Sequence, residues 1–225
     1  MRTVGVVLDL LLPDRCVVCG VDGAGLCGAC LDRLPRLRPP LCARCGAPTA
    51  WPVARCRECA GRRLAFATAR AAVEYDDAVR RLVAGWKEHG RRRIAETATR
   101  LVSEVIERPE VDALVPIPPD HDRMLWRGHH PAAALARGLA DLWELPVSAA
   151  LARSGSATRQ RGLSLAERRR NVRGAFEARQ SPRRVALVDV VYTTGATAAA
   201  AASALRKAGA VRVVVITFAR ALRRD

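Results

Sequence analysis

The sequence predicts an α/β protein whose sheet is mainly parallel, preceded by a small N-terminal cysteine-rich module. Three observations lead to this fold class. All eight cysteines lie within residues 16–59. From residue 64 onward, apolar segments typical of buried strands alternate with helical segments, which is the element order of a parallel α/β sheet. A Thr/Gly-rich turn then joins an apolar segment to an alanine-rich helix near the end of the chain. We therefore expect a module over residues 1–62 and an α/β domain over residues 63–225.

The cysteines of the module form four Cys-x-x-Cys pairs. Two such turns aim four thiolates at one tetrahedral zinc ion and leave no open position, so we expect structural zinc. The simplest arrangement has two sites, each built from two consecutive pairs, and an interleaved pairing of first with third is the alternative. A disulfide framework is disfavoured by the doublet spacing. The pairs are Cys16/Cys19, Cys27/Cys30, Cys42/Cys45 and Cys56/Cys59.

The charge of the chain is strongly positive, at +16, and almost all of it comes from arginine. Such a surface attracts phosphates of nucleotides, nucleic acids or diphosphate substrates. The alternative is a compositional bias, because the arginines are spread along the chain. No apolar run approaches the about 20 residues that a membrane-spanning helix needs. Residues 4–12 are predicted as a short amphipathic helix and not a signal peptide, and we expect a cytoplasmic protein.

The first half of the α/β domain contains two predicted strands. Residues 64–75 alternate into a strand, and two helices follow over about 76–88 and 91–107. An apolar run over 111–117 predicts a buried strand, which the prolines at 116, 118 and 119 end sharply.

The second half begins with a helix over about 131–143, for which Pro131 suits the first turn. A short strand near 147–152, an irregular polar segment at 153–163 and a basic helix at about 164–172 follow. The final strands are predicted at about 184–188 and 211–218, on either side of a helix over about 196–208.

The turn between residues 189 and 197 has the composition of an anion site. A buried strand is expected to stop at Asp189, and the turn that follows contains Thr193, Thr194, Gly195 and Thr197. N–H groups at a helix start attract an anion, and the threonine hydroxyls add donors. Glycine allows close approach of the backbone. The alternative is that Thr193 and Thr194 only cap the helix.

Several motifs together resemble the ComF family, across nearly the whole chain. The resemblance begins at Leu8–Gly20, which looks like the entry to that family's zinc module. Val115–Pro118 followed by Arg123 and Arg127-Gly128 resembles its second strand and loop, and residues 158–172 resemble its mobile loop. The turn at 193–197 resembles the signature for phosphoribosyl diphosphate (PRPP). The resemblance implies a phosphoribosyltransferase fold of type I and a role in DNA uptake during natural transformation.

The resemblance also implies roles for individual residues. Asp189 would hold the ribose hydroxyls of PRPP and act as the catalytic carboxylate, and Mg²⁺ would accompany the diphosphate. The 5-phosphate would be bound by Thr193, Thr194, Gly195, Ala196 and Thr197. The diphosphate would be neutralised by Lys87, Arg91 and Arg159.

The chain departs from the family pattern at two positions. Val190 stands where the signature usually carries a second acid, and His129-His130-Pro131 replaces the usual Phe-Asn-Gln. We expect these histidines to be surface loop residues, and the tryptophans to pack rather than stack on bases. Three interpretations of function remain open: a phosphoribosyltransferase, a catalytically impaired competence protein that binds single-stranded DNA, and a PRPP sensor without turnover. Proteins of the competence machinery are the partners that the resemblance implies.

Overall fold

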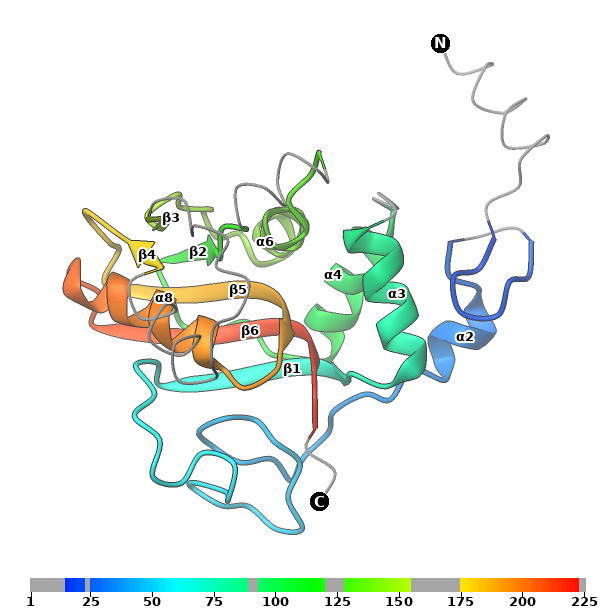
Figure 1. The fold of residues 1–225 in the computed structure, drawn as a ribbon, viewed down its shortest axis with the longest axis horizontal. Coiled ribbons are helices and arrows are strands. Elements are labelled where there is room, and N and C mark those ends of the chain that lie inside the picture. Colours follow the sequence, from blue (N-terminus) through cyan, green and yellow to red (C-terminus); the bar gives the residue numbers. More distant parts are fainter. Residues whose placement is uncertain (1–14, 23–24, 89–92, 120–127, 155–174, 223–225) are drawn as a thin grey trace, which may run out of the picture.

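A computed structural model describes residues 15–22, 25–88, 93–119, 128–154 and 175–222 of the chain. A four-stranded sheet forms its centre, with the strand order β1-β6-β5-β2, and every neighbouring pair in it is parallel (Figure 1). The mainly parallel α/β class is therefore confirmed. The sheet consists of β1 (Thr68–Glu74), β2 (Ala113–Pro116), β5 (Arg184–Tyr192) and β6 (Arg212–Arg220).

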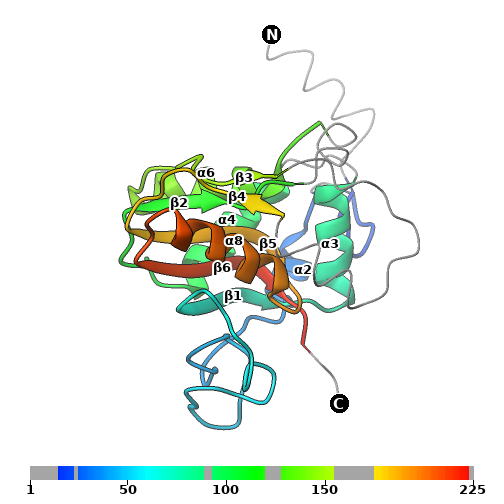
Figure 2. The ribbon, with the colours of Figure 1, turned by 60° about the vertical axis from the view of Figure 1, so that its left-hand side comes forward.

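Helices cover both faces of this sheet (Figure 2). Alternate side chains of β5 enter two apolar clusters: Ala186 and Val188 pack with α3, α4 and α6, whereas Val185 and Leu187 pack with α8. None of the helices in the described ranges is long and apolar enough to cross a membrane. The helices are α2 (Gly28–Asp32), α3 (Asp77–Lys87), α4 (Ile94–Val105), α6 (Pro131–Trp143) and α8 (Ala196–Lys207).

The strand predicted near 147–152 was wrong in detail. In place of a strand over 147–152, Val147 makes a single parallel bridge to Leu114, since only the neighbours of that bridge hydrogen-bond to β2. A separate short pair of antiparallel strands, β3 (Ala152–Arg153) and β4 (Phe176–Glu177), follows. The predicted helices at 4–12 and 164–172, and most of the polar segment 153–163, lie outside the described residues.

The edge strand β1 is covered by the end of the cysteine module. Backbone bonds run from Leu37 N–H to Ala72 O at 2.8 Å and from Ala69 N–H to Arg44 O at 2.9 Å. Figure 1 shows the loops of residues 35–63 below β1, at the lower side of the sheet. Because an uncovered edge offers unpaired backbone groups to other chains, this cover completes the sheet.

Candidate functional site

The candidate site lies where β5 ends and α8 begins. β5 continues to Tyr192 rather than stopping before Asp189, so the predicted strand end at 188 was wrong. The reason is that the residues beyond Asp189 keep pairing with β6: Asp189 lies opposite Thr217, and Tyr192 lies opposite Arg220. The carboxylate is therefore fixed within the sheet ladder, and the turn proper is only three residues long.

The backbone of the turn depends on Gly195. This residue has φ of 72°, and a Cβ atom there would lie 2.2 Å from the hydroxyl oxygen of Tyr192. Glycine is thus required both for the left-handed conformation and for the close packing of the tyrosine. Gly195 is also the N-cap of α8, and no side chain caps the helix there.

In the part of the chain that the structure describes, the first amide groups of α8 have no backbone acceptor. The first bond of the helix runs from Ala199 N–H to Gly195 O at 2.8 Å, so the N–H groups before Ala199 have no helical acceptor. Thr194 Oγ1 makes only a long contact, 3.4 Å, with the N–H of Ala196. The side chains of Thr193, Thr194 and Thr197 are exposed. An oxyanion can therefore approach both amide and hydroxyl donors.

A cleft of about 260 Å³ brings several of the predicted residues together. Asp189 from β5 and Thr197 from α8 line it, and Lys87, the last residue of α3, contributes a cation. The proline turn after β2 forms a further wall, because Ile117 N–H still bonds Val188 O at 2.9 Å. A second hollow of about 20 Å³ lies beside Thr193 and Gly195, enough for about one water molecule.

The electrostatics of the cleft centre on Asp189. Burial raises the pKa of this carboxyl, while Lys87, the N–H of Val190 at 2.7 Å, His130 and Arg153 act to lower it. Burial has the opposite effect on the pKa of His130, which it lowers, and this favours the neutral ring. A carboxylate that lies near the cations Lys87 and Arg153 is suited to accept hydrogen bonds from hydroxyl groups of a ligand.

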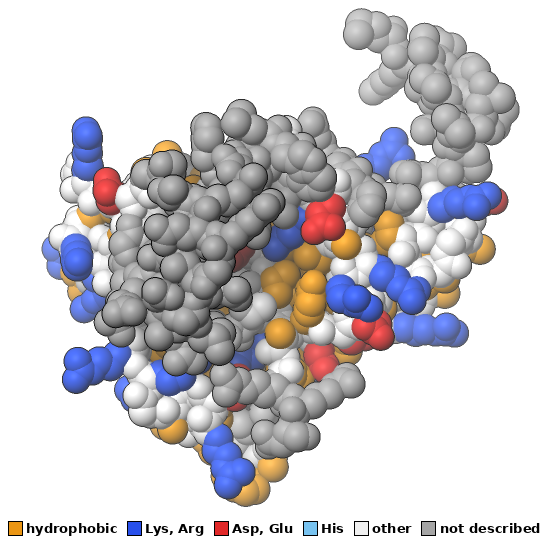
Figure 3. All heavy atoms as spheres, in the orientation of Figure 1, with side chains coloured by type: hydrophobic (Ala, Val, Ile, Leu, Met, Phe, Trp, Pro, Cys, Tyr) orange, Lys and Arg blue, Asp and Glu red, His pale blue; other side chains and the backbone are white. Residues whose placement is uncertain are grey.

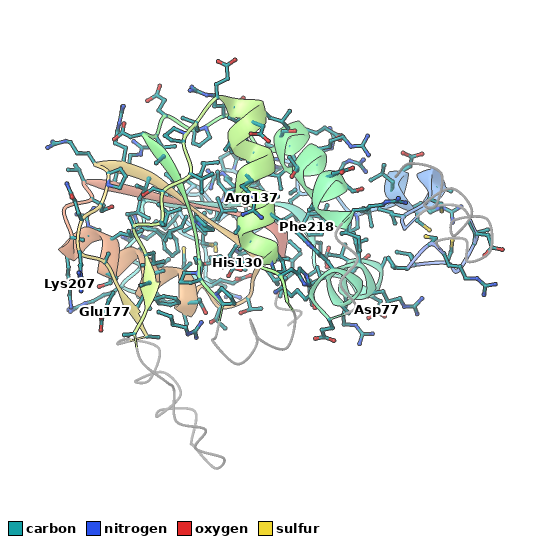
Figure 4. All side chains as sticks on the ribbon, turned by 90° about the horizontal axis from the view of Figure 1, so that it is seen from above. Asp77, His130, Arg137, Glu177, Lys207 and Phe218 are labelled. Carbon is teal, nitrogen blue, oxygen red and sulfur yellow. The ribbon has the colours of Figure 1, made fainter. Side chains whose placement is uncertain are left out.

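The two histidines are tied into the fold, which corrects the expectation of surface loop residues. His130 Nε2 lies 3.0 Å from the carbonyl of Ile117, and His129 Nε2 lies 2.7 Å from that of Trp86. Figure 4 shows His130 at the N-terminal end of α6. Each ring therefore fixes the start of α6 against a neighbouring element. Arg91 and Arg159, the other two predicted diphosphate ligands, lie outside the described residues.

The eight cysteines gather into two groups of four, as consecutive pairs. Cys16, Cys19, Cys27 and Cys30 form the first ribbon (residues 15–30), and Cys42, Cys45, Cys56 and Cys59 form the second ribbon (residues 41–62). Within each group the four sulfurs lie within 4.8 Å of one another. Tetrahedral zinc with bonds of about 2.3 Å places sulfurs about 3.8 Å apart. The separations of Cys42 from Cys59, 3.7 Å, and of Cys45 from Cys56, 3.5 Å, fit that geometry.

The environment of the sulfurs also favours a cation. Burial opposes ionisation of Cys16 and Cys42, but nearby N–H groups outweigh it and lower both pKa values to about 6. Burial and the neighbouring thiols raise the pKa of Cys30 to about 12, and burial raises that of Cys45. A divalent metal offsets the repulsion among four thiolates, so these residues fit structural zinc.

Sequence reasoning missed two arginines that reach the turn from a distance. Arg62 donates to the carbonyl of Thr194, 132 residues away. Arg220 is 2% exposed and stacks over the ring of Tyr192 at 4.6 Å. The only signal in the sequence was for Arg220, a charged residue at the end of a long apolar strand.

Comparison with known proteins gives relatives along nearly the whole chain. Competence protein F of Haemophilus influenzae is 29% identical over 226 residues, covering 92% of this chain and 97% of that protein. DNA utilization protein YhgH is 29% identical over 230 residues in Salmonella typhi and in Escherichia coli K12, covering 95% of this chain and 100% of each relative. The family model described as a double zinc ribbon domain matches residues 7–60.

Among solved structures, glutamine PRPP amidotransferase from B. subtilis, complexed with ADP and GMP, is similar over 54% of this chain, with 22% identity and a TM-score of 0.38. This chain spans a quarter of that protein, 25%. The fold class is instead established by the parallel sheet itself. The chain is therefore similar, over nearly its whole length, to competence protein F and to DNA utilization protein YhgH, and it has a double zinc ribbon domain at its N-terminal side.

Proposed function

We propose that this protein binds PRPP, or a related sugar phosphate, at the turn 193–197. The observation that carries the proposal is that N–H groups without a helical acceptor, at the start of α8, lie at the same cleft as the Asp189 carboxylate. The turn would receive the terminal phosphate, since N–H groups and the helix dipole both favour an anion there. Asp189 would accept hydrogen bonds from the ribose hydroxyls.

The diphosphate would lie toward Lys87 and the proline turn, within the same cleft. Among the described residues lining the cleft, Asp189 is the one carboxylate. Mg²⁺ therefore fits as an ion carried mainly by substrate oxygens, where it would neutralise the diphosphate. The chain's own residues would bind and orient the sugar phosphate on either side of it.

We further propose phosphoribosyl transfer as the reaction of this site. An acceptor nucleophile would attack C1 of the ribose as the C1–O bond to diphosphate breaks, and the diphosphate would leave with the bonding electron pair. Lys87 would stabilise the charge that grows on the leaving oxygens, and Asp189 would keep the cation-like sugar in place. Val190 is apolar and 1% exposed, so it offers no second carboxylate, and Asp189 would hold the sugar without one.

Calorimetric titration with PRPP and Mg²⁺ tests the binding site. Wild type should bind, and Thr194→Arg should abolish binding because the long side chain fills the turn. Leu142→Arg is the matched control, since it adds the same charge at an exposed position of α6. Wild-type protein that fails to bind PRPP, or Thr194→Arg that binds normally, would contradict the proposal. Release of diphosphate on adding nucleophilic acceptors then separates an enzyme from a sensor.

A second candidate function is binding of single-stranded DNA, and one observation favours it. Trp51 in the second ribbon is 68% exposed, contrary to the expectation that it packs. Arg55 and Arg57 nearby in the chain are also exposed. An exposed aromatic ring beside cations suits base stacking with backbone contacts. On the face shown in Figure 3, the Lys and Arg side chains do not gather into one patch, so the ribbon is the better candidate surface.

The DNA proposal is tested by measuring binding to a fluorescent oligonucleotide against salt concentration. Trp51→Ala should weaken binding by about 5- to 100-fold, the range expected for one stacked base, whereas Leu142→Ala should not. Affinity that is independent of salt, or equal for wild type and Trp51→Ala, would exclude this surface.

A further inference from the structure

The second ribbon contacts the turn that we assign to the phosphate. Arg62, three residues after the ligand Cys59, extends from the ribbon, and its Nη2 donates to the carbonyl oxygen of Thr194. The backbone N–H of Arg62 donates to the carbonyl of Cys59 at 3.2 Å. The position of this arginine is thus set by a zinc-ligand residue on one side and by the turn on the other.

This contact fixes the direction of a neighbouring amide. The peptide between Thr194 and Gly195 is planar and trans, so its C=O and N–H point in opposite directions. When Arg62 holds the carbonyl toward the ribbon, the N–H of Gly195 is turned to the other side. That N–H is one of the donors that the phosphate would use. Within the described ranges, Arg62 is the one hydrogen-bond partner of this peptide.

Arg220 makes a second connection between the same ribbon and the same turn. Its Nη1 donates to the carbonyl of Cys45, and its Nη2 pairs with Glu58, both at 2.6 Å. Its guanidinium lies over the ring of Tyr192, whose hydroxyl in turn packs against Gly195. A zinc-ligand residue and the residue before the turn therefore share one buried arginine.

We propose that the second ribbon completes the phosphate site, with Arg62 and Arg220 as positioning residues that hold the turn 193–197 in the shape that receives an anion. The inference rests on the proposed function of the turn. It assigns the ribbon a role in ligand binding beyond its own stability. By thermodynamic linkage, an anion in the turn should also stabilise the second cysteine group.

The first test compares PRPP binding by calorimetry, in the presence of Mg²⁺, across variants at the end of the ribbon. Arg62→Ala should weaken binding about tenfold while the thermal melting midpoint stays within a few degrees of wild type. Arg62→Lys, which keeps a donor and a charge, should restore part of the loss. Arg63→Ala is the matched control, because this neighbour is exposed and should bind as wild type does.

The second test follows zinc release from the intact protein with a chelating dye. PRPP should slow release of one of the two zinc equivalents in wild type, and this protection should vanish in Arg62→Ala. Equal PRPP affinity of wild type and Arg62→Ala, together with no protection of zinc by PRPP in wild type, would overturn this inference while leaving the proposed function in place. Wild type that does not bind PRPP at all would overturn the proposed function itself.

Discussion

The two ribbons have the same local construction but very different surroundings. In each, a glycine follows the first pair and donates its N–H to the first cysteine: Gly20 to Cys16 O at 2.8 Å, and Gly46 to Cys42 O at 2.9 Å. The first ribbon has an exposed ligand, Cys19, and lies beside α3 at the periphery. The second has three buried ligands within the cluster that also contains α8. The shared Cys-x-x-Cys pairs therefore favour the same metal, zinc, in both ribbons, whereas the packing around each ribbon decides which other parts of the protein depend on that metal.

Loss of a zinc ligand should separate the ribbons most strongly. Cys45→Ser should lower the melting midpoint by more than about 10 °C or prevent folding, because the second ribbon carries core packing as well as zinc. Cys19→Ser should release one zinc equivalent and leave the sheet folded. Calorimetry together with zinc analysis measures both effects. Equal destabilisation by the two variants would show that the ribbons do not differ in this way.

The knuckle glycines offer a smaller but cleaner comparison. Gly46 has φ of 71°, and a Cβ atom there would lie 2.4 Å from the carbonyl oxygen of Ala69 in β1, whereas Gly20 has φ of 78° and open space around it. Gly20→Ala should cost only the about 1–2 kcal/mol of a left-handed alanine. Gly46→Ala should cost clearly more, since the clash is with backbone. The free energies of denaturant unfolding should show this order, and the reverse order would mean that the second ribbon does not press on β1.

At the turn that the second ribbon contacts, Asp189→Asn should change stability and binding in opposite directions. The raised pKa means that between about pH 4 and the folded value the native state binds more protons than the unfolded chain, so stability falls as pH rises. The amide side chain of the Asp189→Asn variant does not ionise, so the variant lacks this loss of stability with rising pH. The variant should therefore melt higher than wild type near neutral pH, and the gain should shrink toward about pH 4.

The affinity of the Asp189→Asn variant for PRPP should decrease, in contrast to its stability. Losing one charge-assisted hydrogen bond to the ribose should weaken PRPP affinity about 10- to 100-fold. Melting curves across pH and calorimetric titration of the same preparation check both parts. A variant that is less stable than wild type at neutral pH, or that binds PRPP unchanged, would remove Asp189 from the proposed site.

The smallest effect is expected at the attachment of the first ribbon. Arg81 Nη1 donates to the carbonyl of Val18 at 3.0 Å in an exposed setting. Arg81→Ala should cost less than about 0.5 kcal/mol of unfolding free energy, as exposed contacts usually do. A loss of several kcal/mol in the same denaturant titration would show that the first ribbon is integrated as firmly as the second.

Whether a feature could be predicted from the sequence depends on how far apart in the chain the contacting residues lie. The cysteine pairs and the run from Thr193 to Thr197 are local patterns whose spacing states their geometry, and the parallel sheet follows from the alternation of elements. The bond from Arg62 to Thr194 spans 132 residues, and nothing in the local sequence selects this arginine from its many neighbours. The extension of β5 to Tyr192 was missed because pairing with β6, not local propensity, keeps those residues extended. The proposed boundary between residues 62 and 63 stays a prediction.

The pairing of β1 with β6 bears on how the protein is made. β1 leaves the second ribbon directly, yet its sheet partner is the final strand of the described chain. During synthesis the ribbons can take up zinc long before that partner exists. The contacts that Arg220 of β6 makes with Cys45 and Glu58 of the second ribbon must therefore wait until β6 emerges, and until then β1 lacks its partner strand. Metal loading and completion of the turn 193–197 can thus be separate events in time, with the turn assembled last.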